Sequence, residues 1–413
     1  MAVIKPFKAI RPKEGLESKI AALPYDVYNR AEAKEAVKGN PLSFLNIDRP
    51  ETQFDDDFDM YSDEAYNKAS ELLLGMLSRG EYIREDSDCY YIYELTMNGR
   101  AQTGIVACAS VDDYINENIK KHENTRADKE LDRIHHVDTL SAQTGPIFLA
   151  YKSNETLNSV VSKTKANKPI YDFVSEDGIS HRVWIINELS DINVIKKAFE
   201  GINSIYIADG HHRCASAVKV SLKRREAKPD YTNNEEFNYF LSVLFPDDQL
   251  MIMDYNRVVK DLNGHSEEEV LKCLSEVGTL VPLVDENKHP IKKGDVSVYI
   301  SDSWYTLSFN NSLLSDDPVE GLDVSVLQNN VLKPLFNIED PKTDKRIDFV
   351  GGIRGTDELE RRVKTDCKIA FAMYPTSIQE LFDVADAGLL MPPKSTWFEP
   401  KLRSGIFIHE IEK

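Results

Sequence analysis

The sequence predicts an α+β fold with mixed sheets. Two alternating runs, at 89–97 and 99–111, flank an Asn-Gly pair at 98 and 99, which is a strong signal for a β-hairpin. Residues 183–226 follow the order strand, helix, strand, helix, a βαβ-like pattern. With 413 residues, 41% of them hydrophobic, the chain can bury a substantial core in two domains or one large one.

The remaining elements follow from periodicity and from turn residues. Ser62 is a plausible cap for a long amphipathic helix, and Gly80 lies just past its end. Upstream of residue 180, we expect strands at 3–10, 43–47 and 145–151, helices at 30–38 and 62–79, a turn at 23–28, and helical segments on both sides of a break near 124–125.

The second half of the chain continues this mixture of strands and helices. Glycine, proline and asparagine separate the periodic segments. We expect strands at 244–259, 296–300, 304–309, 346–350, 368–374 and 404–411, and helices at 323–332, 357–364 and 378–387. The composition changes near residue 260, which suggests a core domain at 1–260 and a C-terminal α+β part at 261–413.

Charge and composition narrow the class of protein. The formal net charge is −19, so long-range repulsion disfavours binding to nucleic acid or to an anionic membrane. No apolar run approaches the roughly 20 residues of a membrane-spanning helix, and the start of the chain does not resemble a signal peptide. The five cysteines are scattered, without a CxxC pair. These features predict a cytoplasmic protein with reduced cysteines.

The segment DGHHR at 209–213 is the first candidate site. Gly210 permits a close approach of backbone to ligand, and the amides of His211, His212 and Arg213 open a helix whose dipole favours an anion. Arg213 can add a bidentate contact to phosphate oxygens. Asp209 could hold a metal ion or accept a proton. The alternative is an ordinary turn whose histidines only cap or pack.

Two further segments carry polar side chains on irregular backbone. KHENT, at 121–125, could hold phosphate, magnesium or an attacking hydroxyl group, although a charged solvated helix has the same composition. The loop PPKSTWFEPKL could be a binding loop or a surface connection. No phosphate loop, dinucleotide fingerprint, nucleophile elbow or HExxH motif is present.

Six segments together resemble one family, named domain of unknown function 1015. They are PYDV at 24–27, KHENT at 121–125, RADKELDRIHHVDTLSAQTGPIFLAY at 126–151, ADGHHR at 208–213, LDVSVLQNNVLKPLF at 322–336, and MPPKSTWFEPKL at 391–402. DGHHR also resembles the phosphate-binding turn of the ParB and sulfiredoxin-like superfamily, and within it the chain looks most like the free serine kinases. The resemblance therefore implies a ParB/sulfiredoxin-like nucleotide-binding core within 1–260.

The resemblance implies an activity, a set of ligands and a set of site residues. The activity is phosphoryl transfer from ATP or ADP, with Mg²⁺, to a small hydroxyl substrate such as L-serine; a non-catalytic nucleotide-binding regulator and a phosphate-releasing hydrolase are the alternatives, and self-association stays open. Asp209, Glu123 and His122 are the catalytic candidates, with Asp209 and Glu123 also the metal candidates. Nucleotide contacts fall to Gly210, His211, His212, Arg213, Lys121, Asn124, Thr125, Lys394, Ser395 and Thr396, and substrate contacts to Tyr25, Asp26 and Lys401.

Overall fold

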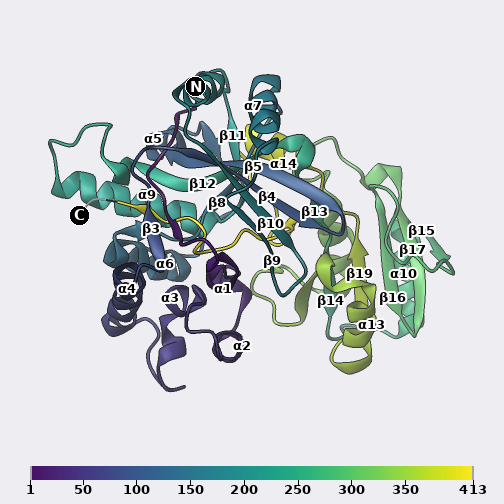
Figure 1. Ribbon diagram of the computed structural model, residues 1–413. Helices are drawn as coiled ribbons and strands as arrows, with labels where there is room; N and C mark the ends of the chain where they lie inside the picture. The colour runs from purple at the N-terminus through teal and green to yellow at the C-terminus, as the bar shows by residue number, and fades with distance from the viewer. Residues whose placement is uncertain (1, 412–413) are drawn as a thin grey trace. The chain divides into compact units, whose positions relative to one another are not determined.

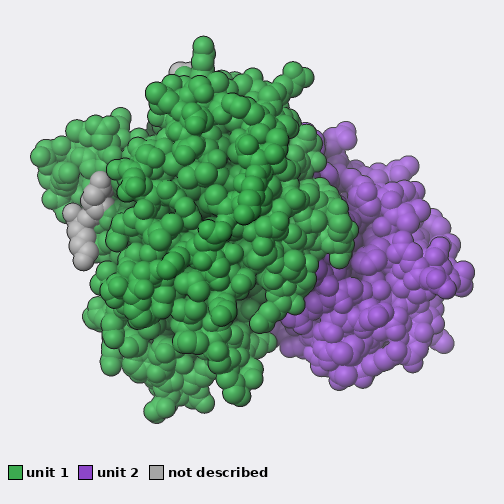
Figure 2. Space-filling model, viewed as in Figure 1, with its two compact units in different colours: residues 1–250, 400–413 green, residues 251–399 purple. Residues whose placement is uncertain are grey.

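The computed structural model describes residues 2–411 and contains two compact units. Unit 1 comprises Met1–Leu250 and Pro400–Lys413, and unit 2 comprises Met251–Glu399 (Figures 1 and 2). The unit boundary precedes the expected boundary at residue 260, and the chain returns to unit 1 at Pro400. This return depends on pairing between distant segments, such as Ile10 with Ile408, which leaves no local signal in the sequence.

Unit 1 is built on a nine-stranded mixed sheet. Its strands are β1 (Ile4–Lys5), β4 (Tyr90–Met97), β5 (Arg100–Ser110), β6 (Ile119–Lys120), β8 (Ile147–Tyr151), β9 (Tyr171–Val174), β10 (Ser180–Ile186), β11 (Ile205–Asp209) and β12 (Tyr239–Pro246). Their order is β6-β11-β8-β12-β5-β4-β10-β9, with β1 paired to β5. Only the β6–β11 and β8–β12 pairs are parallel. The mixed α+β class is confirmed.

The predicted hairpin is the β4–β5 pair. Its turn residues Asn98 and Gly99 have φ values of 51° and 78°. Two consecutive positive φ angles match the right-handed twist of the flanking strands, which is why Asn-Gly is favoured at such turns. The register runs from Met97 opposite Arg100 to Tyr91 opposite Val106.

The helices of unit 1 include three that pack side by side, α4, α6 and α9 (Figure 1). The predicted cap of α4 is confirmed, because the Ser62 side chain accepts a hydrogen bond from the amide of Ala65. The helices are α1 (Glu17–Ile20), α2 (Arg30–Ala36), α3 (Leu45–Asp48), α4 (Asp63–Ser78), α5 (Val111–Ile115), α6 (Ala127–Leu140), α7 (Glu155–Lys165), α8 (Leu189–Glu200) and α9 (His211–Ala227).

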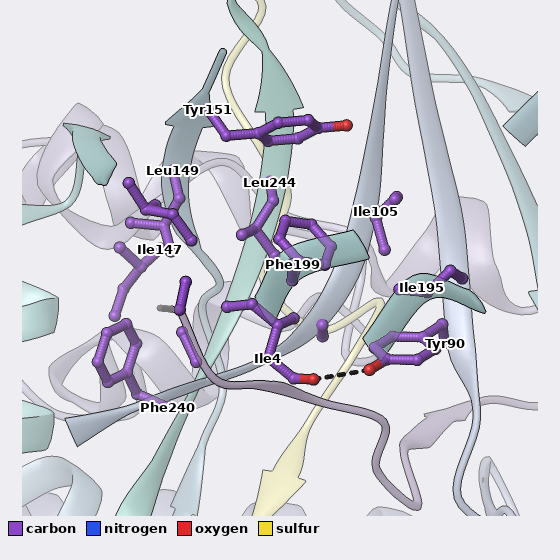
Figure 3. Packing of buried hydrophobic residues seen from close by; sticks show 14 of the residues in the cluster. Ile4, Tyr90, Ile105, Ile147, Leu149, Tyr151, Ile195, Phe199, Phe240 and Leu244 are labelled. Carbon is purple, nitrogen blue, oxygen red and sulfur yellow. Dashed lines mark hydrogen bonds between the residues drawn. The ribbon is translucent and has the colours of Figure 1, made fainter. Parts of the chain in front are cut away.

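One apolar core joins the large sheet to helices α7, α8 and α9. Figure 3 shows part of it, where Phe199 of α8 lies among side chains of the sheet, and the hydroxyl of Tyr90 donates a 2.7 Å hydrogen bond to the carbonyl of Ile4. A second core lies under α1 to α4 and includes Phe44, Leu73 and Ile408. The C-terminal segment is thereby part of the core of unit 1.

Two small sheets complete unit 1. Strand β2 (Ile10–Pro12) pairs with β3 (Tyr82–Arg84), and β7 (Ala142–Gln143) pairs with β21 (His409–Glu410). The expected long strands at 3–10 and 404–411 are therefore wrong in extent. In each segment the backbone changes partners after a few residues, so an apolar pattern continues while the regular pairing stops.

Two other expectations in this half are wrong. Residues 43–47 form a turn and the start of α3, whose four residues are all buried, and a run buried on every side carries no period that separates strand from helix. The segment before KHENT contains the short strand β6 and no helix beyond α5. Glu117, with a φ of 59°, turns the chain between them.

The βαβ-like pattern at 183–209 is also corrected. Strand β10 lies between β4 and β9, whereas β11 lies between β6 and β8, so α8 connects strands at distant places in the sheet. Strand β11 is antiparallel to β8. The expected placement of DGHHR after a strand and at the start of a helix is nevertheless confirmed.

Unit 2 has a six-stranded antiparallel sheet in the order β15-β17-β16-β19-β14-β18. The predicted helix at 323–332 is interrupted by a π-helical turn at Gln328–Leu332. Its elements are β13 (Ile252–Met253), β14 (Tyr255–Val259), α10 (Glu267–Val277), β15 (Gly278–Pro282), β16 (Asp295–Ile300), β17 (Ser303–Phe309), α11 (Asp323–Leu327), α12 (Lys333–Phe336), β18 (Ile347–Gly351), α13 (Gly355–Thr365), β19 (Ile369–Met373), α14 (Ile378–Asp386) and β20 (Trp397–Phe398).

Candidate functional site

The DGHHR turn joins the end of β11 to the start of α9. Gly210 precedes the helix with a φ of 94°, a left-handed conformation that favours glycine. A Cβ at this position would lie 3.1 Å from Nε of Arg213, whose guanidinium folds back over the turn. No side chain caps the helix, and the first amides of a helix have no partner within it. These amides and Arg213 form a compact group of donors suited to an anion.

Arg213 is held by a second backbone segment, at 145–146. Its Nη1 donates a 2.6 Å hydrogen bond to the carbonyl of Pro146. A Cβ on Gly145 would lie 3.5 Å from the same Nη1, an ordinary contact distance, so the guanidinium packs directly against this backbone segment. The guanidinium of Arg213 thus packs between two stretches of backbone that are distant in the chain.

Asp209 is fixed by two donors. Its Oδ1 accepts a 2.8 Å hydrogen bond from the amide of Gly210, and its Oδ2 lies 3.0 Å from Nζ of Lys401. Desolvation raises the pKa of Asp209, but the charges of Lys401 and Arg213 outweigh it, so the pKa lies well below the ordinary value. Asp209 is therefore a weak base, and Lys401 acts on it directly.

Two buried histidines pack against each other beside the turn. The ring centres of His122 and His211 are 4.5 Å apart, and the two rings are nearly perpendicular. Nδ1 of His211 lies 3.9 Å from a carboxylate oxygen of Glu123. Desolvation lowers the pKa of His122 to about 4 and that of His211 well below the ordinary value. Both rings are neutral at pH 7. They can donate or accept hydrogen bonds but add no positive charge.

The KHENT segment is docked on α9 by polar contacts. The amide of Arg126 donates a 3.0 Å hydrogen bond to Nε2 of His212, which places the proton of the neutral ring on Nδ1. Desolvation lowers the pKa of His212. Thr125 donates to Glu130, which also pairs with Lys219 of α9. The structure thus brings KHENT beside DGHHR.

Lys121, Asn124 and Asp26 are exposed, whereas Tyr25 is buried. Tyr25–Val27 form a 3₁₀ turn. Two arginines outside the predicted set of site residues hold this turn. Nη1 of Arg49 donates to the carbonyls of Tyr25 and Tyr28 at 2.9 and 2.7 Å.

The second missed arginine, Arg133 of α6, stacks on Tyr25 with its guanidinium 4.0 Å from the ring centre. Its pKa is raised, because the charge of Asp132 outweighs the cost of burial. Both missed arginines are more than nine-tenths buried. Arginine is rarely buried unless paired, but nothing local in the sequence marks which arginines are buried.

Two cavities of unit 1 share Tyr25 and Arg133 as a common wall. The smaller, of about 30 Å³, is also lined by Arg213, Gly145 and His136. This is about the volume of one water molecule. The larger, of about 140 Å³, lies on the side of Asp26 and Lys129. A nucleotide is too large for either of these two cavities. A further pocket of unit 1, of about 300 Å³, lies away from the turn and is lined by residues between Lys163 and Asp191.

Among residues 2–411, no group of three or more histidine, cysteine, aspartate or glutamate side chains could hold a metal ion by itself. Mg²⁺ commonly takes one or two protein carboxylates and completes its shell with water and substrate phosphates. Asp209 and Glu123 fit that limited role, since both belong to segments beside the turn.

Lys394, Ser395 and Thr396 belong to unit 2. Lys394 has a φ of 59°, and its Nζ lies 5.4 Å from the centre of the Tyr255 ring. Its carbonyl accepts a 3.0 Å hydrogen bond from Arg257, and the carbonyl of Ser395 accepts a 2.9 Å bond from Thr376. The loop is thus fixed by its own unit.

Fold and site together define a mixed α+β protein with a glycine turn at an uncapped helix start. A family model described as "Protein of unknown function (DUF1015)" matches residues 4–325, more than three-quarters of the chain. The chain belongs to this family, as its motifs predicted.

Several solved structures are similar at low level. A mutant of free serine kinase in complex with AMP has 14% identity and a TM-score of 0.37, with 75% of this chain and 92% of that chain covered. C-terminally truncated SbnI from Staphylococcus aureus has 10% identity and a TM-score of 0.36, with 71% and 82% covered. A conserved hypothetical protein from Pyrococcus furiosus has 14% identity and a TM-score of 0.35, with 74% and 94% covered.

A search of the curated proteins finds no match. Within residues 2–411, no helix has both the length and the apolar character needed to cross a bilayer.

Proposed function

We propose that unit 1 binds the phosphates of ATP or ADP at the 209–213 turn and transfers a phosphoryl group to a small hydroxyl substrate, L-serine. The observation that carries the proposal is the uncapped start of α9, with Gly210 in the left-handed conformation and Arg213 folded over it. Phosphoryl transfer depends mainly on positioning and on neutralising charge, which helix amides and an arginine supply. The resemblance of the motifs to free serine kinases supplies the acceptor.

The roles of the charged groups follow from their surroundings. Arg213 and the amides of residues 211–213 would bind phosphate oxygens, with the neutral rings of His211 and His212 as hydrogen-bonding partners. Lys121 and Lys401 would add positive charge, and Mg²⁺, held by phosphates and a carboxylate, would neutralise more.

Glu123 is a better candidate for the base than Asp209. The ion pair with Lys401 depresses the pKa of Asp209 and weakens it as a proton acceptor. The side chain of Glu123 is 43% exposed, so a substrate can reach it. In the proposed step, the serine oxygen attacks the terminal phosphorus, the bond to the bridging oxygen breaks, and the hydroxyl proton passes to Glu123. The products are O-phosphoserine and the nucleotide shortened by one phosphate.

The test mixes the purified chain with ATP or ADP, Mg²⁺ and L-serine, and measures O-phosphoserine by mass spectrometry. We expect product with the wild type, no product with Arg213→Met, and wild-type rates with Arg361→Met, which removes an exposed arginine of unit 2 paired with Glu358. Glu123→Gln should bind nucleotide normally but lose at least 10²-fold in rate, the usual contribution of a general base. Unfolding midpoints would show that each variant is folded.

Other outcomes would contradict the kinase. Nucleotide-dependent stabilisation without any product would favour a regulatory nucleotide-binding protein. Phosphate release that does not depend on an acceptor would favour a hydrolase. No effect of either nucleotide on the unfolding midpoint would overturn the whole proposal.

A further inference from the structure

The cavity of unit 1 beside Asp26 and Lys129 is lined mainly by polar and charged side chains. Its volume of about 140 Å³ is several times the share of one water molecule in the liquid, about 30 Å³, and suits a ligand of a few non-hydrogen atoms. The lining consists of Tyr25, Asp26, Tyr28, Arg49, Pro50, Glu51, Met60, Tyr66, Lys129, Asp132 and Arg133.

Four of these charges are buried and paired. Arg49 pairs with Glu51, and Nε of Arg133 lies 3.0 Å from Asp132, which also accepts a hydrogen bond from Tyr66. Each is at least nine-tenths buried. Nη2 of Arg49 and Nη1 of Arg133 make no hydrogen bond to the residues that the structure describes. Neither nitrogen is among the fully buried side-chain atoms that lack a partner, so both keep some accessible surface and could donate a hydrogen bond to a ligand.

The two remaining charges, Asp26 and Lys129, are more accessible. Asp26 is exposed and Lys129 is half-buried. The side chain of neither residue forms an ion pair or hydrogen bond with the residues between 2 and 411. They carry opposite charges and line the same cavity, so each could bind the oppositely charged group of one ligand.

The sum of the lining charges selects the class of ligand. Three cationic side chains are balanced by three carboxylates, so the cavity has no net charge to attract a phosphate dianion, and the carboxylates would repel it. A zwitterion suits this lining, because it also has no net charge but carries one positive and one negative group.

From this balance we infer that the cavity is the acceptor pocket and binds a small α-amino acid as its zwitterion. Lys129 and Arg133 bind the carboxylate, and Asp26 and Glu51 bind the ammonium group. The inference rests on the proposed function for the role of the ligand, but the binding itself does not depend on catalysis. Arg133 and Tyr25 also line the smaller cavity with Arg213, so the pocket adjoins the phosphate-binding turn.

The first test is binding to the intact chain without nucleotide, by isothermal titration calorimetry. L-serine should bind, whereas ethanolamine, which lacks the carboxylate, and glycerate, which lacks the ammonium group, should bind at least tenfold more weakly. Lost charge-assisted hydrogen bonds are the physical reason. Equal binding of all three compounds, or no binding of L-serine, would overturn the inference.

The second test uses variants at the two accessible charges. Lys129→Met and Asp26→Asn should each raise the Kd for L-serine at least tenfold and leave the unfolding midpoint nearly unchanged, because neither side chain has a partner to lose. Lys196→Met, at an exposed lysine of α8, is the matched control and should bind L-serine as the wild type does.

The two proposals fail in different ways. If L-serine binds and the variants weaken it but no phosphoserine forms, the pocket stands and the kinase fails. If phosphoserine forms but Lys129→Met and Asp26→Asn leave the KM for L-serine unchanged, the kinase stands and the pocket inference is overturned.

Discussion

Nζ of Lys401 lies 3.0 Å from Oδ2 of Asp209, although the two residues are 192 positions apart. Lys401 belongs to the C-terminal segment that returns to unit 1, and Asp209 ends strand β11. The pair joins the last part of the chain to the turn that opens α9. It also lowers the pKa of Asp209, which makes this carboxylate a weaker proton acceptor.

Lys401→Met should destabilise unit 1 by about 1 kcal/mol at pH 7, because the pair is only partly shielded from water. The folded pKa of Asp209 lies below its unfolded value, near 4, so the pair stabilises the fold above that pH and the stabilisation disappears as the pH falls. Urea unfolding at pH 7 and pH 3 should show that the difference in free energy of unfolding between wild type and variant is smaller at pH 3. A larger difference at pH 3 would contradict the lowered pKa of Asp209.

Gly210→Ala should weaken nucleotide binding more than it weakens the fold. A left-handed alanine costs about 1–2 kcal/mol, and its Cβ would also press on the guanidinium of Arg213 at 3.1 Å. Gly80→Ala is the control, since Gly80 has a φ of 69° and open space around it. Thermal unfolding should give similar losses for the two variants. Only Gly210→Ala should lose nucleotide binding, measured by calorimetry, and equal binding would exclude the turn as the site.

The burial of His122 should make stability fall between pH 6.5 and pH 4. The folded pKa of about 4 lies below the unfolded value of 6.5. As the pH is lowered from 6.5 to 4, the unfolded state therefore takes up a proton before the folded state does, and the free energy of unfolding decreases. The full contribution is about 3 kcal/mol. Denaturant unfolding of the wild type and His122→Gln should show a shallower loss in the variant. Parallel curves would mean that the pKa of the ring is the same in the folded and unfolded states, which would contradict the effect of burial.

Loss of the stacking of Arg133 on Tyr25 should lower the stability of unit 1 and weaken the binding of L-serine, because both residues line both cavities. Tyr25→Leu removes the ring and should cost about 1–2 kcal/mol, whereas Tyr25→Phe keeps the ring face and should cost less. Burial raises the pKa of Tyr25 to about 12, so the hydroxyl stays protonated at pH 7 and supplies no charge. Unfolding midpoints and L-serine titrations of both variants check this. Equal effects would mean that the hydroxyl, and not the ring, supports Arg133.

Local signals in the sequence predicted the local elements well. Asn98 and Gly99 predicted the hairpin, Ser62 predicted the start of α4, and the apolar run at 145–151 predicted β8, because turn conformation, capping and burial act within a few residues. These local signals could not predict which distant segments of the chain pair with each other. Strand β6 has two residues and exists only because β11 lies beside it.

The features of the candidate site also fall into those that the sequence predicted and those that depend on tertiary structure. The sequence by itself determined the DGHHR turn, since an acid, a glycine and a helix start in that order fix the backbone locally, and its motifs determined the family. Only the tertiary structure decided that Lys401 meets Asp209, that His122 and His211 are neutral, and that Arg49 and Arg133 line a polar cavity. Desolvation and charge pairing depend on neighbours in space, and neighbours far apart in the chain leave no trace in local composition.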